Sequence, residues 1–154
     1  MLNLPVPDFE LPSTGDTPFR LSDYRGKNLV IYFYPKDNTP GCTTEGLQFR
    51  DAYAQFKKAD CDIVGISRDS LKSHHSFKTK MSFPFELLSD ADETACKLFA
   101  AIKMKNMYGK QVRGIERSTF VVDKAGVLRQ EWRGVKVPEH VAAVLQFVQT
   151  LDKT

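Results

Sequence analysis

The sequence predicts an α/β fold in which helices cover both faces of a central mixed sheet. Residues 28–34 form a nearly continuous apolar and aromatic run, which is typical of a strand buried on both faces. A helical pattern follows, and a second apolar run at 62–67 completes a β-α-β unit, whose crossover should be right-handed. A hairpin pattern near the C-terminus, followed by a helix, adds antiparallel strands to this parallel pair.

The N-terminal part of the chain predicts a hairpin, a short turn and, after the buried strand, a helix. Strand-like alternation over 8–11 and again at 19–21 predicts a hairpin around Ser13-Thr14-Gly15-Asp16, and residues 22–26 predict a short turn. Apolar side chains at the i, i+3, i+4 and i+7 positions predict an amphipathic helix over 42–59; they are Phe49, Ala52, Tyr53 and Phe56.

The remaining residues continue the alternation of helices and strands. Patterning and turn residues predict a helix over 70–81, a strand over 85–88, a helix over 90–102, a loop over 103–116, a strand pair at 118–123 and 127–132, and a last helix from Pro138. A β-α-β start, a hairpin and a closing helix are the arrangement of the thioredoxin-like fold. At 154 residues, we expect one domain over 1–154.

Composition excludes several classes of function. The chain is 42% hydrophobic and 27% charged, as in an ordinary globular protein, and no stretch approaches the roughly 18 apolar residues of a membrane span. The first residues lack the pattern of a signal peptide, so we expect a cytoplasmic protein. The net charge of +3 is modest. One basic cluster, predicted to be a solvated loop, comprises Lys103, Lys105, Lys110 and Arg113. We expect no nucleic-acid partner, and a monomer, with a homodimer as the alternative.

The cysteines and histidines do not form a metal or disulfide pattern. The three cysteines are an odd number without C-x-x-C spacing, which argues against a disulfide framework. His74 and His75 are adjacent, so on a helix their side chains diverge by about 100° and chelate poorly. We therefore expect no metal site and no cofactor.

Cys42 is the candidate for chemistry, because it lies where a buried strand has ended and a helix begins. Unpaired N–H groups and the helix dipole favour a thiolate at that place. Gly41 has no Cβ to obstruct a small ligand, and the Thr39 hydroxyl can both donate and accept a hydrogen bond. The alternative is that Cys42 is only a packed apolar residue.

The chain resembles the peroxiredoxins, in particular the bacterioferritin comigratory protein or peroxiredoxin Q subfamily. Pro35, Thr39 and Cys42 match the Pro-x-x-x-Thr/Ser-x-x-Cys motif of that family, within the string Tyr-Pro-Lys-Asp-Asn-Thr-Pro-Gly-Cys-Thr-Thr-Glu at 34–45. Further similar stretches lie at 7–11, 65–70, 83–90 and 117–123. The resemblance covers nearly the whole chain and implies a thiol peroxidase.

The resemblance also implies a role for each matched residue. Cys42 would attack the peroxide, and Arg117 matches the family's active-site arginine. The backbone N–H of Cys42 and the Thr39 hydroxyl would donate to the peroxide oxygens. Pro35 would shield the pocket from water, and Glu45 would orient the arginine. Glu45 also suits the first turn of a helix as an acidic residue.

The chain departs from its relatives in the residue that should resolve the oxidised cysteine. Many relatives have a second cysteine where this chain has Leu47, and others where it has Lys78. Cys61 lies past the far end of the predicted helix, about 25 Å from Cys42, whereas a disulfide requires Cα atoms within about 7 Å. Cys96 is the one remaining alternative, although its position on a core-facing helix suits packing.

We therefore expect a one-cysteine mechanism, in which an external thiol such as thioredoxin, or glutaredoxin with glutathione, reduces Cys42. Two other interpretations compete with it. A thioredoxin-like disulfide reductase would need a second cysteine where Glu45 stands. A non-catalytic binding protein or holdase would use Cys42 for packing alone.

Overall fold

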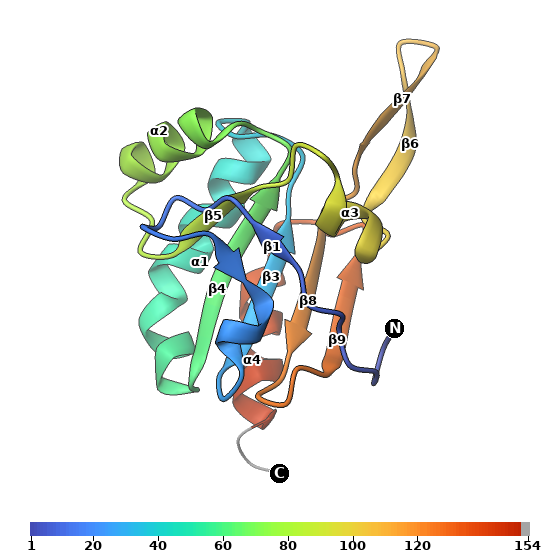
Figure 1. Cartoon of the computed structure of the whole chain (residues 1–154). Coiled ribbons are helices and arrows are strands. Elements are labelled where there is room, and N and C mark those ends of the chain that lie inside the picture. Colours follow the sequence, from blue (N-terminus) through green and yellow to red (C-terminus); the bar gives the residue numbers. More distant parts are fainter. Residues whose placement is uncertain (152–154) are drawn as a thin grey trace.

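A computed structural model of the chain describes residues 1–151 and is built around one five-stranded mixed sheet (Figure 1). Its strand order is β5-β4-β3-β8-β9. β3 (Asn28–Phe33) lies at the centre, parallel to β4 (Cys61–Ser67) and antiparallel to β8 (Ser118–Val122). The edges are β5 (Glu86–Ser89) and β9 (Leu128–Arg133). The predicted mixed sheet and its C-terminal strand pair are confirmed.

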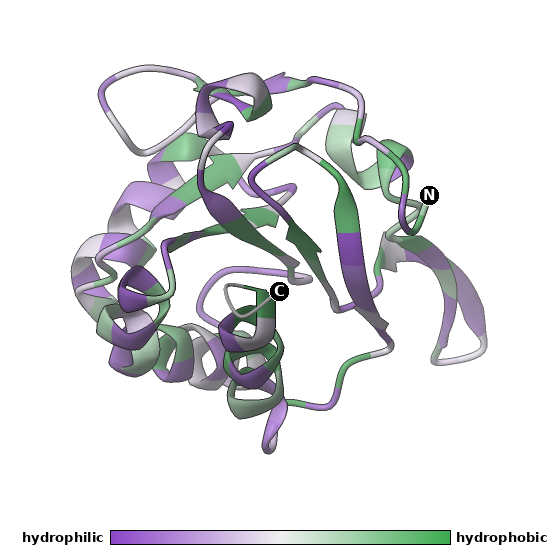
Figure 2. Cartoon of the chain, turned by 90° about the horizontal axis from the view of Figure 1, so that it is seen from below, coloured by the Kyte–Doolittle hydropathy of each residue, from purple (hydrophilic) through white to green (hydrophobic). Residues whose placement is uncertain are grey.

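The pleat of β3 divides the apolar core into two halves. Val30 and Tyr32 face α1 (Pro40–Lys58), α2 (Leu71–Met81) and α4 (His140–Leu151). Leu29 and Ile31 face the opposite way, toward the N-terminal segment and α3 (Thr94–Leu98). A strand buried on both faces needs apolar residues at every position, and the central strands are correspondingly green in Figure 2. Among the described residues, no helix has the length and hydrophobicity of a transmembrane segment.

The N-terminal hairpin is present and shorter than predicted. β1 (Glu10–Leu11) pairs antiparallel with β2 (Phe19–Arg20), and the turn at 22–26 contains the 3-10 helix η1 (Leu21–Tyr24). Phe9, Leu11 and Phe19 are buried against the sheet.

Two helices differ in their bounds from the sequence-based expectation because residues with positive φ stand at their ends. The helix predicted over 90–102 is only α3, because Glu93 before it has a φ of 61° and Ala100 after it has a φ of 54°. α4 begins at His140 and not at Pro138, because Glu139 has a φ of 65°. All three values lie in the left-handed region, which a right-handed helix cannot include.

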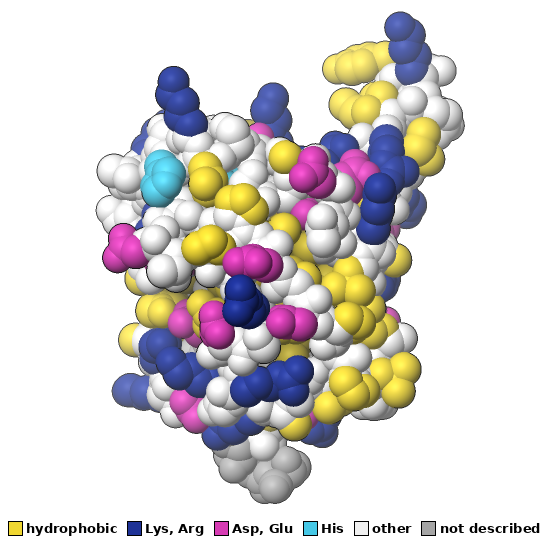
Figure 3. Space-filling model, in the orientation of Figure 1, with side chains coloured by type: hydrophobic (Ala, Val, Ile, Leu, Met, Phe, Trp, Pro, Cys, Tyr) yellow, Lys and Arg dark blue, Asp and Glu magenta, His cyan; other side chains and the backbone are white. Residues whose placement is uncertain are grey.

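The loop predicted over 103–116 is wrong. Strands β6 (Ile102–Met107) and β7 (Lys110–Ile115) form a separate antiparallel hairpin that extends from the body of the molecule (Figure 1). Tyr108 and Gly109 both have positive φ, as a tight hairpin turn requires. Figure 3 shows hydrophobic and basic side chains together on this arm, and Tyr108 is fully exposed. The hairpin was not predicted because these strands contain lysines and methionines in place of alternating β-branched residues.

Helix α1 packs very closely against the segment that joins α2 to β5. Gly46 lies on its buried side, and a Cβ placed there would stand 2.4 Å from Phe83 Cζ. Phe83 in turn stacks on Phe85 and meets Phe77 of α2 edge-on. Gly46 therefore allows α1 to approach the segment that joins α2 to β5.

We expect Gly46→Ala to destabilise the protein by about 1–3 kcal/mol, since the added methyl group must displace a buried aromatic ring. Urea denaturation measures the change in the free energy of unfolding. Gly114→Ala is the control, because the nearest atom to its added Cβ is Lys105 Cδ at 4.0 Å. Equal stability of the Gly46 variant and wild type would contradict this packing.

Candidate functional site

Cys42 lies in the first turn of α1, directly beyond the carboxyl end of β3. The helix begins at Pro40 with Thr39 as its N-cap, two residues earlier than predicted, so Cys42 is its third residue. N–H groups in a first turn have no acceptor within the helix, and they favour negative charge nearby. The Cys42 side chain is 2% exposed, which leaves access only to a small reactant.

Arg117 connects the thiol to a buried carboxylate. Its Nη2 donates to Cys42 Sγ at 3.3 Å, and its Nη1 donates to Glu45 Oε1 at 2.7 Å. The backbone around Arg117 is fixed, because its carbonyl accepts a hydrogen bond from Val135 N–H at 2.9 Å. A Cβ at Gly41 would stand 3.2 Å from Nη2. Gly41 therefore accommodates the guanidinium, whereas the sequence suggested room for a ligand.

Glu45 has no exposed surface and only one of its oxygens is paired. Oε1 accepts from Arg117, while Oε2 has no hydrogen-bond partner. Burial raises the pKa of Glu45 to about 7, and the charge of Arg117 opposes that rise. Desolvation disfavours the charged form of a carboxyl group, so near neutral pH Glu45 is poised to hold or release a proton.

Thr39 and Pro35 belong to the loop that joins β3 to α1. The Thr39 hydroxyl donates to Lys36 O at 2.9 Å. Since a hydroxyl has one hydrogen, Thr39 in this arrangement can offer only lone pairs to a ligand, and the donor role expected from the sequence is not available. Pro35 follows the last residues of β3 and is half-buried.

Hydrogen bonds from a buried acid–histidine pair connect the same loop to α2, and this pair was not predicted from the sequence. Asp37 Oδ2 lies 2.7 Å from His74 Nδ1, and both side chains are buried. Asp37 Oδ1 accepts from the Tyr34 hydroxyl at 2.6 Å, and Oδ2 also accepts from Ser73 at 2.7 Å. His74 Nε2 lies 2.9 Å from Leu88 O. Although burial opposes it, hydrogen bonding to His74 and Tyr34 lowers the pKa of Asp37.

Asp69 extends this network, and the three residues stand close enough to suggest a cation site. Ligand atoms of Asp37, Asp69 and His74 lie within 4.8 Å of one another. However, Asp69 Oδ2 accepts from Ser67 at 2.6 Å and from Asp37 N–H at 2.9 Å. Protein donors thus already converge on the oxygens that would bind a metal ion. The cluster is a hydrogen-bond network that ties the Cys42 loop to α2.

His140 is a second buried histidine close to Arg117. Its Nε2 lies 2.8 Å from Thr119 Oγ1, and burial followed by the charge of Arg117 lowers the pKa of His140 to about 4. His140 is therefore neutral at pH 7. Its only sequence signal was its place after Pro138 and Glu139, which gives no indication that it lies near Arg117.

The other two cysteines are kept apart from Cys42 by the fold. Cys96 is buried in the half of the core on the opposite face of the sheet, and its N–H donates to Asp90 Oδ2 at 2.7 Å. Burial and Asp90 raise the pKa of Cys96 well above its usual range. Cys61 opens β4, past the far end of α1, where its thiol contacts Asp62 O.

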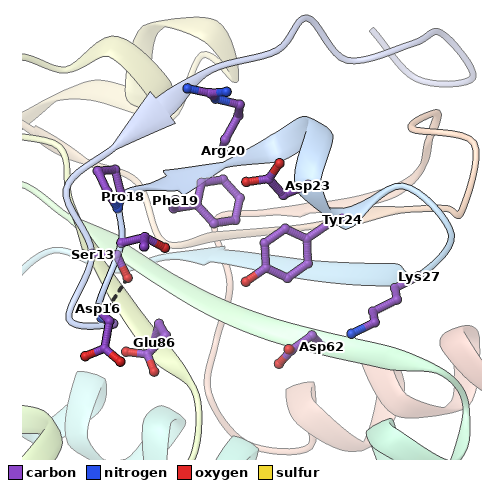
Figure 4. A pocket seen from close by; sticks show the side chains of 12 residues that line it. Ser13, Asp16, Pro18, Phe19, Arg20, Asp23, Tyr24, Lys27, Asp62 and Glu86 are labelled. Carbon is purple, nitrogen blue, oxygen red and sulfur yellow. Dashed lines mark hydrogen bonds between the residues drawn. The ribbon is translucent and has the colours of Figure 1, made fainter.

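A separate hollow of about 310 Å³ lies between the N-terminal hairpin and strands β4 and β5 (Figure 4). It is lined by Tyr24, Lys27, Asp62 and Glu86, among others. Burial, with the charges of Asp62, Glu86 and Asp23, raises the pKa of Tyr24 to about 12. The lining includes neither a cysteine nor a histidine, so nothing there matches the chemistry around Cys42.

Comparison with known proteins identifies the family. Residues 2–131 match the profile of the AhpC/TSA family. The chain is 54% identical over 155 residues to a peroxiredoxin Bcp of Xanthomonas campestris, covering 99% of this chain and 97% of that protein. It belongs to the AhpC/TSA family. A peroxiredoxin Bcp of Bacillus subtilis is 48% identical over 148 residues, with 96% and 94% covered, so the resemblance to the Bcp and peroxiredoxin Q group is confirmed.

Solved structures of this AhpC/TSA group confirm the thioredoxin-like fold. The bacterioferritin comigratory protein of X. campestris matches with a TM-score of 0.89 at 52% identity, covering 93% of this chain and 91% of that one. A peroxiredoxin Q mutant of Xylella fastidiosa matches with a TM-score of 0.91 at 44% identity, covering 99% and 98%. The chain is thus an enzyme of the thiol peroxidase class.

Glu45 should make stability depend on pH in a definite direction. An exposed glutamate has a pKa of 4.5 and folded Glu45 about 7, so the folded state binds more protons between these values. The stability attributable to Glu45 is therefore present at low pH and falls as the pH rises. We expect Glu45→Gln to gain about 3 kcal/mol relative to wild type between about pH 4.5 and about pH 8.

Urea denaturation of both proteins across this range measures the difference in the free energy of unfolding. Glu139→Gln makes the same chemical change at an exposed position and is the control. A constant difference for the Glu45 variant would show that its carboxyl group does not titrate in this window.

Proposed function

We propose that this enzyme reduces hydrogen peroxide and organic hydroperoxides with Cys42 as the nucleophile. The observation that carries the proposal is the guanidinium of Arg117, which donates to Cys42 Sγ from one side and to buried Glu45 from the other. A cation fixed against a thiol at a helix N-terminus favours the thiolate, which is the nucleophilic form. Only a small reactant fits a thiol that is 2% exposed.

In the proposed reaction the Cys42 thiolate attacks the distal oxygen of the peroxide. The S–O bond forms as the O–O bond breaks, and sulfur is oxidised to a sulfenic acid. The departing alkoxide or hydroxide takes up a proton and leaves as alcohol or water. Arg117 and first-turn N–H groups stabilise the negative charge that spreads onto the oxygens. Thr39 accepts a hydrogen bond from the peroxide, and Pro35 limits the access of water.

Relatives support the choice of substrate. The X. campestris bacterioferritin comigratory protein, which this chain matches closely, is described by its alkyl peroxide reduction activity and by trapped intermediate and ligand complexes. We extend that activity to the present chain, because Cys42 supplies a nucleophile, Arg117 supplies a hydrogen-bond donor beside it, and Thr39 supplies an acceptor.

We further propose a one-cysteine cycle completed by an external thiol. Two matched structures are mutants of X. campestris peroxiredoxin Q in which two different cysteines are each replaced by serine. In this chain Lys78, which stands where the resemblance places the second cysteine of some relatives, forms an ion pair with Glu86 at 2.8 Å. The sheet lies between Cys96 and Cys42. Thioredoxin, or glutaredoxin with glutathione, is the proposed reductant, for a monomeric cytoplasmic enzyme.

The competing functions lack this support. A disulfide reductase with C-x-x-C chemistry would need a thiol at Glu45, which is instead a buried carboxylate paired with Arg117. A purely packed cysteine would not need the charged group that Arg117 places 3.3 Å from its sulfur.

Replacement of the nucleophile tests the activity. We expect Cys42→Ser to lose peroxide consumption completely, and Arg117→Lys to lose about 10²–10³-fold in kcat/KM, since a lysine cannot donate to two groups through a planar fork. Peroxide consumption with and without thioredoxin measures both. Cys61→Ser is the matched control and should keep activity. Undiminished activity of Cys42→Ser would overturn the proposal.

The oxidation product tests the one-cysteine cycle. Mass spectrometry of peroxide-treated, non-reduced protein should find one or two added oxygens on Cys42. Cys61 and Cys96 should be unmodified, because α1 separates Cys61 from Cys42 and the sheet separates Cys96 from it. An intramolecular Cys42–Cys96 disulfide would refute the one-cysteine cycle. It would not contradict the proposal that the protein reduces peroxides.

A further inference from the structure

One buried cation stands between two acidic groups at this site. Arg117 donates through Nη2 to Cys42 Sγ and through Nη1 to Glu45 Oε1, and its own side chain is 16% exposed. Glu45 has no exposed surface, and its Oε2 lacks any partner. A single guanidinium therefore has to compensate whichever of the two acids is ionised.

Two simultaneous anions would be costly in this arrangement. If Cys42 were a thiolate and Glu45 a carboxylate together, one of the two negative charges would remain uncompensated in a desolvated place. Nearby like charges push one of a pair of acids toward its protonated form. Independently of the charge on Cys42, burial raises the pKa of Glu45 to about 7 even though Arg117 lies beside it.

We propose that Glu45 keeps a proton while Cys42 is a thiolate and releases it when Cys42 becomes a sulfenic acid. This inference rests on the peroxidase function proposed above and adds to it a proton balance within the site. Glu45 does not touch the reacting atoms, so it is a positioning residue that acts through Arg117. Its role goes beyond orienting the arginine, which a neutral residue could do equally well.

The balance of the step follows from the charges. The thiolate, the peroxide and protonated Glu45 become the sulfenic acid, the alcohol or water, and ionised Glu45. Sulfur donates an electron pair as the O–O bond breaks, the leaving oxygen takes up a proton from solvent, and Glu45 releases one proton to solvent, so that the site takes up no net proton. Before and after the step, Arg117 compensates one anion, first the thiolate and then the carboxylate.

Several other titratable groups of the site and of the neighbouring β3–α1 loop and α4 keep one charge state near pH 7. Tyr32 of β3 has a pKa raised well above its usual value, first by burial and then by Glu45. Asp37 of the β3–α1 loop has a lowered pKa, and burial lowers the pKa of His140 of α4 to about 4. Arg117 stays protonated. The proton that moves with oxidation is therefore shared by Cys42 and Glu45.

Proton uptake during a single oxidation tests the proposal. Reduced protein is mixed with one equivalent of hydrogen peroxide in weakly buffered solution containing a pH-indicator dye, at several values from about pH 6 to about pH 8. Wild type should take up much less than one proton per peroxide near pH 7. Glu45→Gln retains an oxygen that accepts from Arg117 but has no proton to give, so it should take up about one.

A control variant and a second measurement test whether the effect is specific to Glu45. Glu139→Gln should behave as wild type, because its carboxyl group lies on the surface. Infrared difference spectra should show that the carbonyl band of a protonated carboxyl group disappears on oxidation in wild type and is absent in Glu45→Gln.

The failures can be told apart. Equal proton uptake by wild type and Glu45→Gln across the whole range, with peroxide consumed by both, would overturn the proton role of Glu45 and leave the peroxidase function intact. A wild-type protein that consumes no peroxide would instead overturn the proposed function on which this inference rests.

Discussion

The interaction on which the site depends is the contact of Arg117 with both Cys42 and Glu45. The three residues come from two distant parts of the chain: α1 contributes Cys42 and Glu45, and the segment between β7 and β8 contributes Arg117. β3 must therefore pair with β8 in the register that places Phe33 opposite Ser118, because that register brings Arg117 to the carboxyl end of β3. The fold is in this sense the means by which a cation reaches a thiol.

Patterns along the sequence were sufficient to predict the sheet and to place Cys42 in the first turn of a helix that follows a buried strand. The apolar run at 28–34 needs no tertiary context to indicate a buried strand, and the residues after it indicate a helix start at Cys42. The β6–β7 hairpin was missed because Lys103, Lys105 and Lys110 favour solvent more than they favour a strand. The early end of α3 depends on Ala100, a residue type that gives no warning of a positive φ.

Long-range polar contacts were not predictable from local patterns. Glu45 could be expected to orient an arginine from the family resemblance, yet its complete burial and its unpaired oxygen depend on how α1 packs. Likewise, Asp37 and His74 are separated by 37 residues, and only the packing of α2 beside the β3–α1 loop brings them together. Hydrophobic periodicity reports which face of an element is buried, and it carries no information on which polar groups meet there.

Several departures from ordinary packing rules lie around Cys42. A carboxylate with an unpaired oxygen, a left-handed Asn38 and a buried acid–histidine pair all lie within or beside one loop. Each is unfavourable on its own, so the rest of the fold must hold them in place. Gly46 and Phe83 fix α1 from one side, while Asp37 and His74 fix the loop from the other. The stability lost at Glu45 is the consequence of keeping a group that can titrate beside Arg117, and a neutral residue at that position would give a more stable protein with a less responsive site.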